Sequence, residues 1–185
     1  MLNIAIITGS TRPNRVNKQV ADWVLQEAQK NDNAKFELVD IKDYDLPLLD
    51  EPMPAMQNDY QKEHTKKWSK KIKAFDAFII VTPEYNHSTS AALKNAIDFL
   101  FYEWNDKAAG FVSYGSAYGA RAVEHLRLIM AEVKVATVRE QLLISLMDDF
   151  KDYTEFKPKD HHAEKLTEVV KQVISWGEAL KEVRK

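Results

Sequence analysis

The sequence predicts an α/β fold with a doubly wound parallel sheet, carried by a single domain that spans residues 1–185. Short apolar runs rich in β-branched residues alternate along the chain with helical patterns, which is typical of parallel sheets covered by helices. The composition is that of a globular protein, with 45% apolar and 29% charged residues. A chain of 185 residues is also long enough to bury most of its unfolded surface in one domain.

Five segments have the composition of buried strands. Each is a short run of apolar and β-branched residues that gives way to turn-forming or charged residues. The strands are expected at residues 2–8, 35–40, 76–82, 107–114 and 134–145. The last of these contains Arg139 and Glu140, where we expect an interruption.

Helical patterns fill the intervals between the strands and follow the last one. Their apolar residues recur every three to four positions, as on one buried face of a helix. The helices are expected at residues 17–30, 57–73, 88–102, 120–132 and 159–184. The segment 43–54, DYDLPLLDEPMP, contains three prolines and is predicted to be irregular.

Five alternating strands favour the flavodoxin-like strand order 2-1-3-4-5, here with an extra C-terminal helix. In that order the first and third strands are neighbours, and the fourth lies beside the third. Ligands of such sheets bind outside the carboxyl ends of the strands, at the switch point. The loops that follow the first, third and fourth strands should therefore share one edge.

The first of these loops, GSTRPNRVN at residues 9–17, suits an anion. It opens a helix, whose N–H groups favour negative charge. Ser10 and Asn17 add neutral hydrogen-bond donors. Arg12 and Arg15 add guanidinium groups, each of which can donate two parallel hydrogen bonds to a phosphate. The loop is neither a P-loop nor G-x-G-x-x-G, because the required glycines and lysine are absent. The alternative is a polar loop with two solvated arginines.

The other two loops suit a flat ring. Pro83 ends the third strand, since proline has no N–H to donate, and Glu84, Tyr85 and Asn86 follow it. After the fourth strand comes SYGSAYG, which holds two of the five glycines and begins with Ser113-Tyr114-Gly115. The alternative for each loop is an ordinary turn. Together the three loops favour a ligand with an anionic end and a planar end, such as flavin mononucleotide (FMN).

Three segments resemble the NAD(P)H-dependent FMN reductase family, a flavodoxin-like group of flavin, quinone, azo-dye and chromate reductases. They are GSTRPNRVNKQVADWV near the start, TPEYNHSTSAALKNAIDF in the middle and SYGSAYGARAVEHLR after the fourth strand. The segments LPLLDEPMP and KKWSKKI are also similar to the family, so the resemblance covers most of residues 1–145. An arginine stands at position 15 where the family usually has a serine, and Ala91 stands where a glycine is common.

The resemblance implies an FMN-dependent oxidoreductase with NADPH or NADH as cosubstrate. It implies that Ser10, Arg12, Arg15 and Asn17 hold the FMN phosphate, and that two further groups of residues flank the ribityl chain and the ring. Those groups are Pro83, Glu84, Tyr85 and Asn86, and Ser113, Tyr114 and Gly115. Hydride would pass from the nicotinamide to the flavin, and two electrons would then pass to a small-molecule acceptor in a ping-pong cycle. No side chain is expected to act as catalytic acid, base or nucleophile, because the cofactor carries the chemistry.

Charge and composition argue against other partners. A net charge of −2 and a pI near 6.2 suggest neither nucleic acid nor an acidic membrane as a partner. No apolar run approaches the roughly 18 residues of a membrane span. The chain has no cysteine, which fits a cytoplasmic location. No metal site is expected, and the family resemblance implies a homodimer or homotetramer.

Two functions compete with the enzyme. A flavodoxin-like electron carrier would usually present a strongly acidic face, which this nearly neutral chain lacks. A redox-sensing interaction module, in which flavin reduction alters partner binding, is compatible with the sequence and with enzymatic activity.

Overall fold

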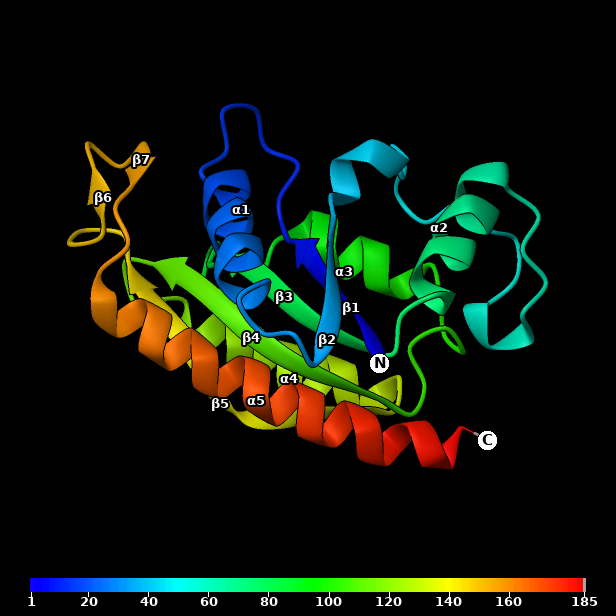
Figure 1. Cartoon of the computed structure of the whole chain (residues 1–185). Helices are drawn as coiled ribbons and strands as arrows, with labels where there is room; N and C mark the ends of the chain where they lie inside the picture. Colours follow the sequence, from blue (N-terminus) through cyan, green and yellow to red (C-terminus); the bar gives the residue numbers. More distant parts are fainter. Residues whose placement is uncertain (185) are drawn as a thin grey trace.

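A computed structural model describes residues 1–184 as a five-stranded parallel sheet with helices on both faces (Figure 1). The strand order is β2-β1-β3-β4-β5, which confirms the flavodoxin-like prediction. The strands are β1 (Leu2–Thr8), β2 (Ala34–Val39), β3 (Ala77–Pro83), β4 (Lys107–Gly115) and β5 (Val135–Ser145). Every residue of β3 and of β4 is buried, as expected for central strands covered on both faces.

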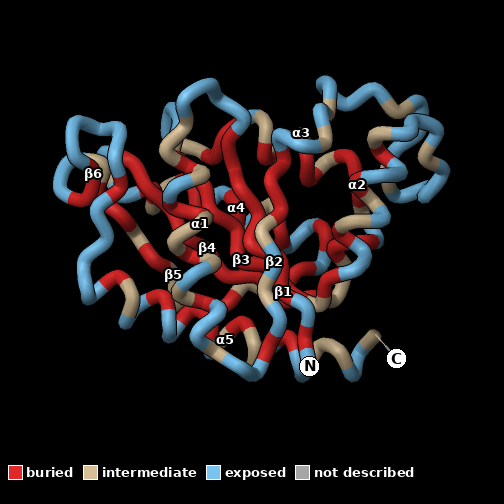
Figure 2. The backbone as a smooth tube through the Cα atoms, turned by 45° about the horizontal axis from the view of Figure 1, so that its top comes forward, coloured by how far each residue is buried: buried red, intermediate tan, exposed pale blue. Residues whose placement is uncertain are grey.

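The helices divide into two layers. On one face lie α1 (Asn17–Ala28) and α5 (Asp160–Val183), and on the other lie α2 (Glu63–Lys73), α3 (Ala91–Asp98) and α4 (Ala120–Glu132). Successive side chains of β1 point to opposite faces of the sheet, so β1 packs against both layers of helices. Leu2 packs with α1 and α5, whereas Ala5 packs with the helices of the opposite layer. Figure 2 shows the sheet as a continuous buried centre under an exposed rim. Among residues 1–184, no helix is both long and apolar enough to cross a membrane.

Four of the five helices are shorter than predicted, the last of them by one residue at each end. The helix expected at 57–73 begins at Glu63, because the short 3₁₀ helix η2 (Ala55–Gln57) stops at Asn58 in a left-handed conformation. The helix expected at 88–102 is α3, which begins after Ser90, whose hydroxyl accepts from the N–H of Leu93 at 3.0 Å. The helix expected at 17–30 ends at Ala28.

The interruption predicted in β5 is confirmed. Ala109 and Phe111 of β4 face Thr137 and Gln141 of β5, so β5 carries extra residues opposite Gly110. Helix α5 comes so close at this point that a Cβ on Gly110 would lie 2.7 Å from a methyl carbon of Val169. A side chain at position 110 would therefore push α5 away from the sheet.

Four short elements were not predicted: the 3₁₀ helices η1 and η2 and the strands β6 and β7. The 3₁₀ helix η1 (Ile41–Tyr44) extends into the segment expected to be irregular. Beyond β5, β6 (Phe150–Lys151) and β7 (Glu155–Phe156) form an antiparallel hairpin. Elements of two to four residues are too short to show a hydrophobic period, so the sequence gives no signal for them.

Candidate active site

A cavity of about 260 Å³ lies at the carboxyl edge of the sheet, where the loops after β1, β3 and β4 meet. Its walls come from these three loops, from the end of β5 and from the β6–β7 hairpin. The lining residues are Arg12, Asn14, Arg15, Val16, Pro83, Glu84, Tyr85, Tyr114, Gly115, Leu146, Tyr153 and Thr154. Most of the residues singled out in the sequence thus lie around one cavity. Ser10 and Asn86 lie in the same loops, Asn17 begins α1 and Ser113 belongs to β4, but none of the four lines the cavity.

Asn17 and Ser10 fix the β1–α1 loop. Asn17 is fully buried, and its side chain accepts from the N–H of Gly9 at 3.0 Å and donates to the carbonyl of Val81 at 3.0 Å. The Ser10 hydroxyl lies 3.2 Å from the phenol oxygen of Tyr85 and accepts from the N–H of Arg12. The loop is therefore tied to β3 and to the ring of Tyr85 before any ligand binds.

The two arginines of this loop differ in their surroundings. Arg15 forms an ion pair with the carboxylate of Asp40 and donates to the carbonyl of Ser10 at 2.7 Å. Asp40 is held in turn by the hydroxyl of Thr8 at 2.9 Å. Arg12 is exposed, and its guanidinium has no hydrogen-bond or ion-pair partner within residues 1–184. The guanidinium of Arg12 is thus available to an anion, while that of Arg15 fixes the loop to the end of β2.

Glu84 connects the β3 loop to α4. Its carboxylate, which is 3% exposed, accepts from the Arg121 side chain at 2.6 Å and from the Arg121 backbone N–H at 3.1 Å. The next residues form a tight turn in which Tyr85 and Ser88 exchange backbone hydrogen bonds. Asn86 has a φ of 47°, a conformation that asparagine tolerates better than most residues. The side chain of Glu84 therefore serves the loop structure, and Asn86 serves the turn.

The β4 loop is set by Ser113 and Gly119. The fully buried hydroxyl of Ser113 donates to the carbonyl of Tyr118 at 3.2 Å, which closes the loop onto the strand. Gly119 has a φ of 75°, and a Cβ there would lie 2.6 Å from the Cβ of Ser113. Tyr114 is 5% exposed, and burial raises the pKa of its phenol, so the hydroxyl stays protonated beside the cavity. The end of β4 thus presents the neutral phenol ring of Tyr114 and the backbone of Gly115 to the cavity.

Asn14 and Val16 line the cavity within the predicted phosphate loop, although neither was predicted as a site residue. Outside that loop, four residues at or beside the cavity were not predicted: Asp40, Leu146, Tyr153 and Thr154. Asp40 had a usable signal, because it is an acidic residue at the expected carboxyl end of the second strand. No motif marks the other three, which become part of the cavity only through the packing of the chain after β5.

The fold is that of a flavodoxin-like α/β protein with a cavity at the carboxyl edge of its sheet. A family model for NADPH-dependent FMN reductase matches residues 2–149, and the chain belongs to this family. It is therefore an oxidoreductase that uses FMN, with NAD(P)H as electron donor. The family, the cofactor and the enzyme class predicted from the sequence are confirmed.

Known relatives agree with this assignment. The chain is 38% identical over 148 residues to an NAD(P)H-dependent FMN reductase of Schizosaccharomyces pombe, an alignment that covers 79% of this chain and 74% of the relative. It is 40% identical to an NAD(P)H-dependent FMN reductase of a Nectria species, with 75% and 74% covered. Among solved structures it resembles FerB, a flavoenzyme NAD(P)H:acceptor oxidoreductase from Paracoccus denitrificans. The TM-score is 0.75 and the identity 23%, over 97% of this chain and 98% of FerB. At that identity the likeness shows the fold alone.

Proposed function

We propose that the cavity at the carboxyl edge of the sheet binds FMN and that Arg12 is the main contact of its phosphate. The guanidinium of Arg12 carries this proposal, because it lines the cavity without a partner among residues 1–184 and its paired N–H donors match a phosphate. Ser10 is buried outside the cavity lining, and together with Arg15 and Asn17 it holds the loop in the shape that presents Arg12. Pro83, Tyr85 and Tyr114 supply apolar and aromatic surface for the ribityl chain and the ring.

The remaining predicted residues support this surface. Glu84 and Asn86 fix the turn that carries Tyr85, and Ser113 ties the loop after Gly115 to the end of β4. Bound FMN supplies the chemistry, by accepting a hydride from NAD(P)H and passing two electrons to an acceptor. The protein would orient the reactants, and backbone N–H groups beside the ring would stabilise the negative charge of the reduced flavin. No side chain is assigned as catalytic acid, base or nucleophile.

The proposed cycle is ping-pong, with a quinone, a flavin, an azo compound or chromate as acceptor. Names of two relatives favour quinones: an NAD(P)H:quinone oxidoreductase of Solanum tuberosum at 31% identity and a 2-hydroxy-1,4-benzoquinone reductase of a Burkholderia species at 30%. Steady-state rates with varied NADPH and varied benzoquinone should give parallel double-reciprocal lines. Intersecting lines would show that both substrates bind together and would overturn the ping-pong cycle.

Tyr85 offers the most direct test of the ring surface. Its side chain is 36% exposed, and its phenol lies 3.2 Å from the Ser10 hydroxyl. Tyr85→Ala should raise the Kd for FMN about tenfold, since it removes both the ring and the contact to the β1 loop. Tyr85→Phe keeps the ring and should lose less. An alanine variant with the FMN affinity of the wild type would exclude Tyr85 from the site.

We further propose that the chain is a single cytoplasmic domain that forms a homodimer or homotetramer. Large apolar side chains stay exposed in the segment between β2 and α2, among them Leu48 at 84% and Met56 at 57%. Leu100 and Trp104, which follow α3, are buried in the core of the chain and add nothing to this exposed surface. The interface is therefore expected at the exposed segment. A monomeric mass in solution for the FMN-loaded protein would contradict it.

A further inference from the structure

The β6–β7 hairpin follows directly after the part of the chain that the family model matches, residues 2–149. It nevertheless contributes Tyr153 and Thr154 to the same cavity as Arg12 and Tyr114. Figure 1 shows the hairpin rising beside α1, on the side of the molecule where the β1–α1 loop also projects. The family motifs therefore describe only part of the wall of this cavity.

Helix α1 holds the hairpin through the side-chain amide of Gln19. Its Nε2 donates to the carbonyl of Thr154 at 2.8 Å, and its Oε1 accepts from the N–H of Phe156 at 3.0 Å. The amide thus pairs with β7 as a neighbouring strand would, with one donor and one acceptor. Because Gln19 belongs to the helix that follows the phosphate-type loop, the hairpin and that loop are fixed relative to each other.

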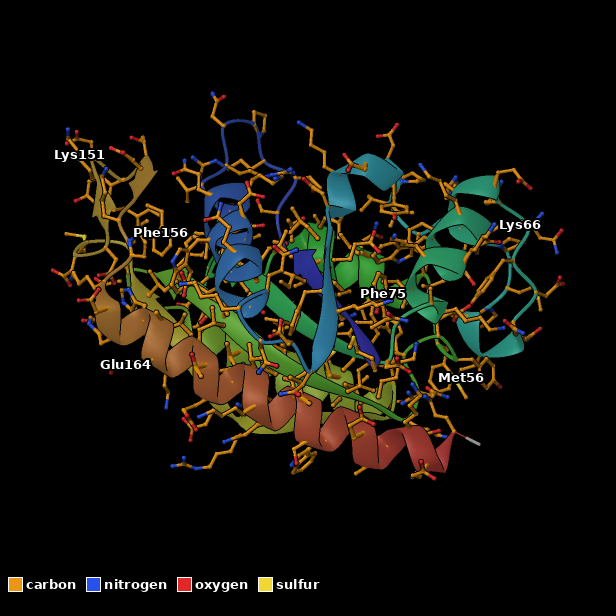
Figure 3. All side chains as sticks on the ribbon, in the orientation of Figure 1. Met56, Lys66, Phe75, Lys151, Phe156 and Glu164 are labelled. Atoms are coloured by element: carbon orange, nitrogen blue, oxygen red, sulfur yellow. The ribbon has the colours of Figure 1, made fainter. Side chains whose placement is uncertain are left out.

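Aromatic packing holds the base of the hairpin from below. Phe150 and Phe156 are buried and lie 5.2 Å apart between ring centres. Phe150 contacts Tyr114 of the cavity wall at 5.7 Å, and Phe156 contacts Trp23 of α1 at 5.5 Å. Figure 3 shows Phe156 on the side of the hairpin that faces α1 and Lys151 at its outer side. The hairpin is therefore a braced element with one end free.

The turn between β6 and β7 has an unusual backbone conformation. Asp152 and Tyr153 have φ values of 50° and 57°, and the N–H of Thr154 donates to the carbonyl of Lys151 at 3.0 Å. Both central residues of this tight turn are thus left-handed, which normally calls for Gly or Asn. A tyrosine in this conformation is an outlier for a bulky residue, and such strain gathers at ligand sites. Its ring stays 56% exposed at the cavity, so it has little to gain from packing within the chain.

We propose that the β6–β7 hairpin is a clamp on the FMN site and that Tyr153 contacts the bound FMN. The proposal rests on the proposed FMN site and adds a binding residue that the family motifs do not include. Gln19 is a positioning residue, because it acts on the ligand only through the hairpin. The clamp slows FMN release and leaves the chemistry of the loaded enzyme unchanged.

The test measures the Kd and the dissociation rate of FMN by the change of flavin fluorescence on binding. Tyr153→Gly removes the ring and suits the positive φ, so the hairpin is kept. It should weaken FMN binding about threefold to tenfold, mostly through faster release. Gln19→Ala should do the same, and hydrogen exchange at residues 150–156 should rise in that variant alone. Lys151→Ala on the outer side of the hairpin and Gln26→Ala on an exposed position of α1 are matched controls that should bind as the wild type does.

The outcomes separate this proposal from the proposed function. A wild-type protein that binds no FMN refutes the FMN site itself. A wild type that binds FMN, with Tyr153→Gly binding equally well, refutes the clamp alone. If Tyr153→Gly keeps its FMN but raises the KM for NADPH or quinone, the ring serves the second substrate and the clamp is also refuted.

Discussion

Gly119→Ala should damage both the stability of the protein and its hold on FMN. Gly119 has a φ of 75°, and an alanine in the left-handed region costs about 1–2 kcal/mol. Its Cβ would also lie 2.6 Å from the Cβ of Ser113 and 2.7 Å from the backbone nitrogen of Tyr114. Relief of that clash adds about 1–3 kcal/mol. The free energy of unfolding should therefore fall by about 2–5 kcal/mol in urea titrations.

The effect on the ligand follows from the place of the clash. To make room, the loop of residues 116–119 must move away from the end of β4, where the clash involves Ser113 and the backbone of Tyr114. The ring of Tyr114 and the backbone of Gly115 line the cavity at this point, so the shift disturbs the cavity wall. The Kd for FMN should rise about tenfold or more, measured on protein that is still folded.

Gly110→Ala is the matched control for Gly119→Ala. Its Cβ would clash with the methyl groups of Val169 and Val173 at 2.7 and 2.8 Å, far from the cavity. It should destabilise the protein by about 1–3 kcal/mol and leave the Kd for FMN unchanged. If the two variants lose FMN affinity equally, or if Gly119→Ala loses none, the β4 loop does not shape the ligand site as described.

Two further predictions concern charge. Arg12→Ala should weaken FMN about tenfold and leave the affinity for riboflavin unchanged, because only FMN has a phosphate; an equal loss for both flavins would show that Arg12 does not contact the phosphate. Burial is the main cause that lowers the pKa of Lys107 from 10.5 to about 8, and the nearby charge of Arg184 acts in the same direction. Between these two pH values the lysine is protonated in the unfolded chain and neutral in the native state, so the unfolded chain binds more protons. The free energy of unfolding should then rise by about 2 kcal/mol from pH 7.5 to 9.5, and Lys107→Met should abolish that rise; a rise that persists in the variant would assign it to another group.

The sheet order was predictable because strands and helices alternate with distinct periods and parallel strands need crossover helices. The same argument placed the three ligand loops at one edge, since parallel strands share their carboxyl ends. The roles of the glycine, proline and arginine residues in those loops can be inferred from their local chemistry, without knowledge of the fold. The general position of the site therefore follows from local patterns.

The roles of single site residues depend on contacts between distant parts of the chain. Arg15 and Arg12 look equivalent in the sequence, and only the approach of Asp40 at the end of β2 neutralises one of them. Glu84 lies in a motif that suggests ligand binding, but its carboxylate is used by Arg121, 37 residues further along the chain. Tyr153 lies in a hairpin that is too short to show a period and is held by Gln19, from the opposite end of the chain. No local pattern in the sequence predicts such contacts between distant residues.

The most direct test of the account is the visible spectrum of the purified protein with FMN, recorded before and after anaerobic addition of NADPH. The account predicts flavin bands that stay with the protein on gel filtration and that bleach on addition of NADPH. Bands that stay but do not bleach with NADPH or NADH would favour an electron carrier over an enzyme. A protein that retains no FMN would contradict the assignment of the cavity.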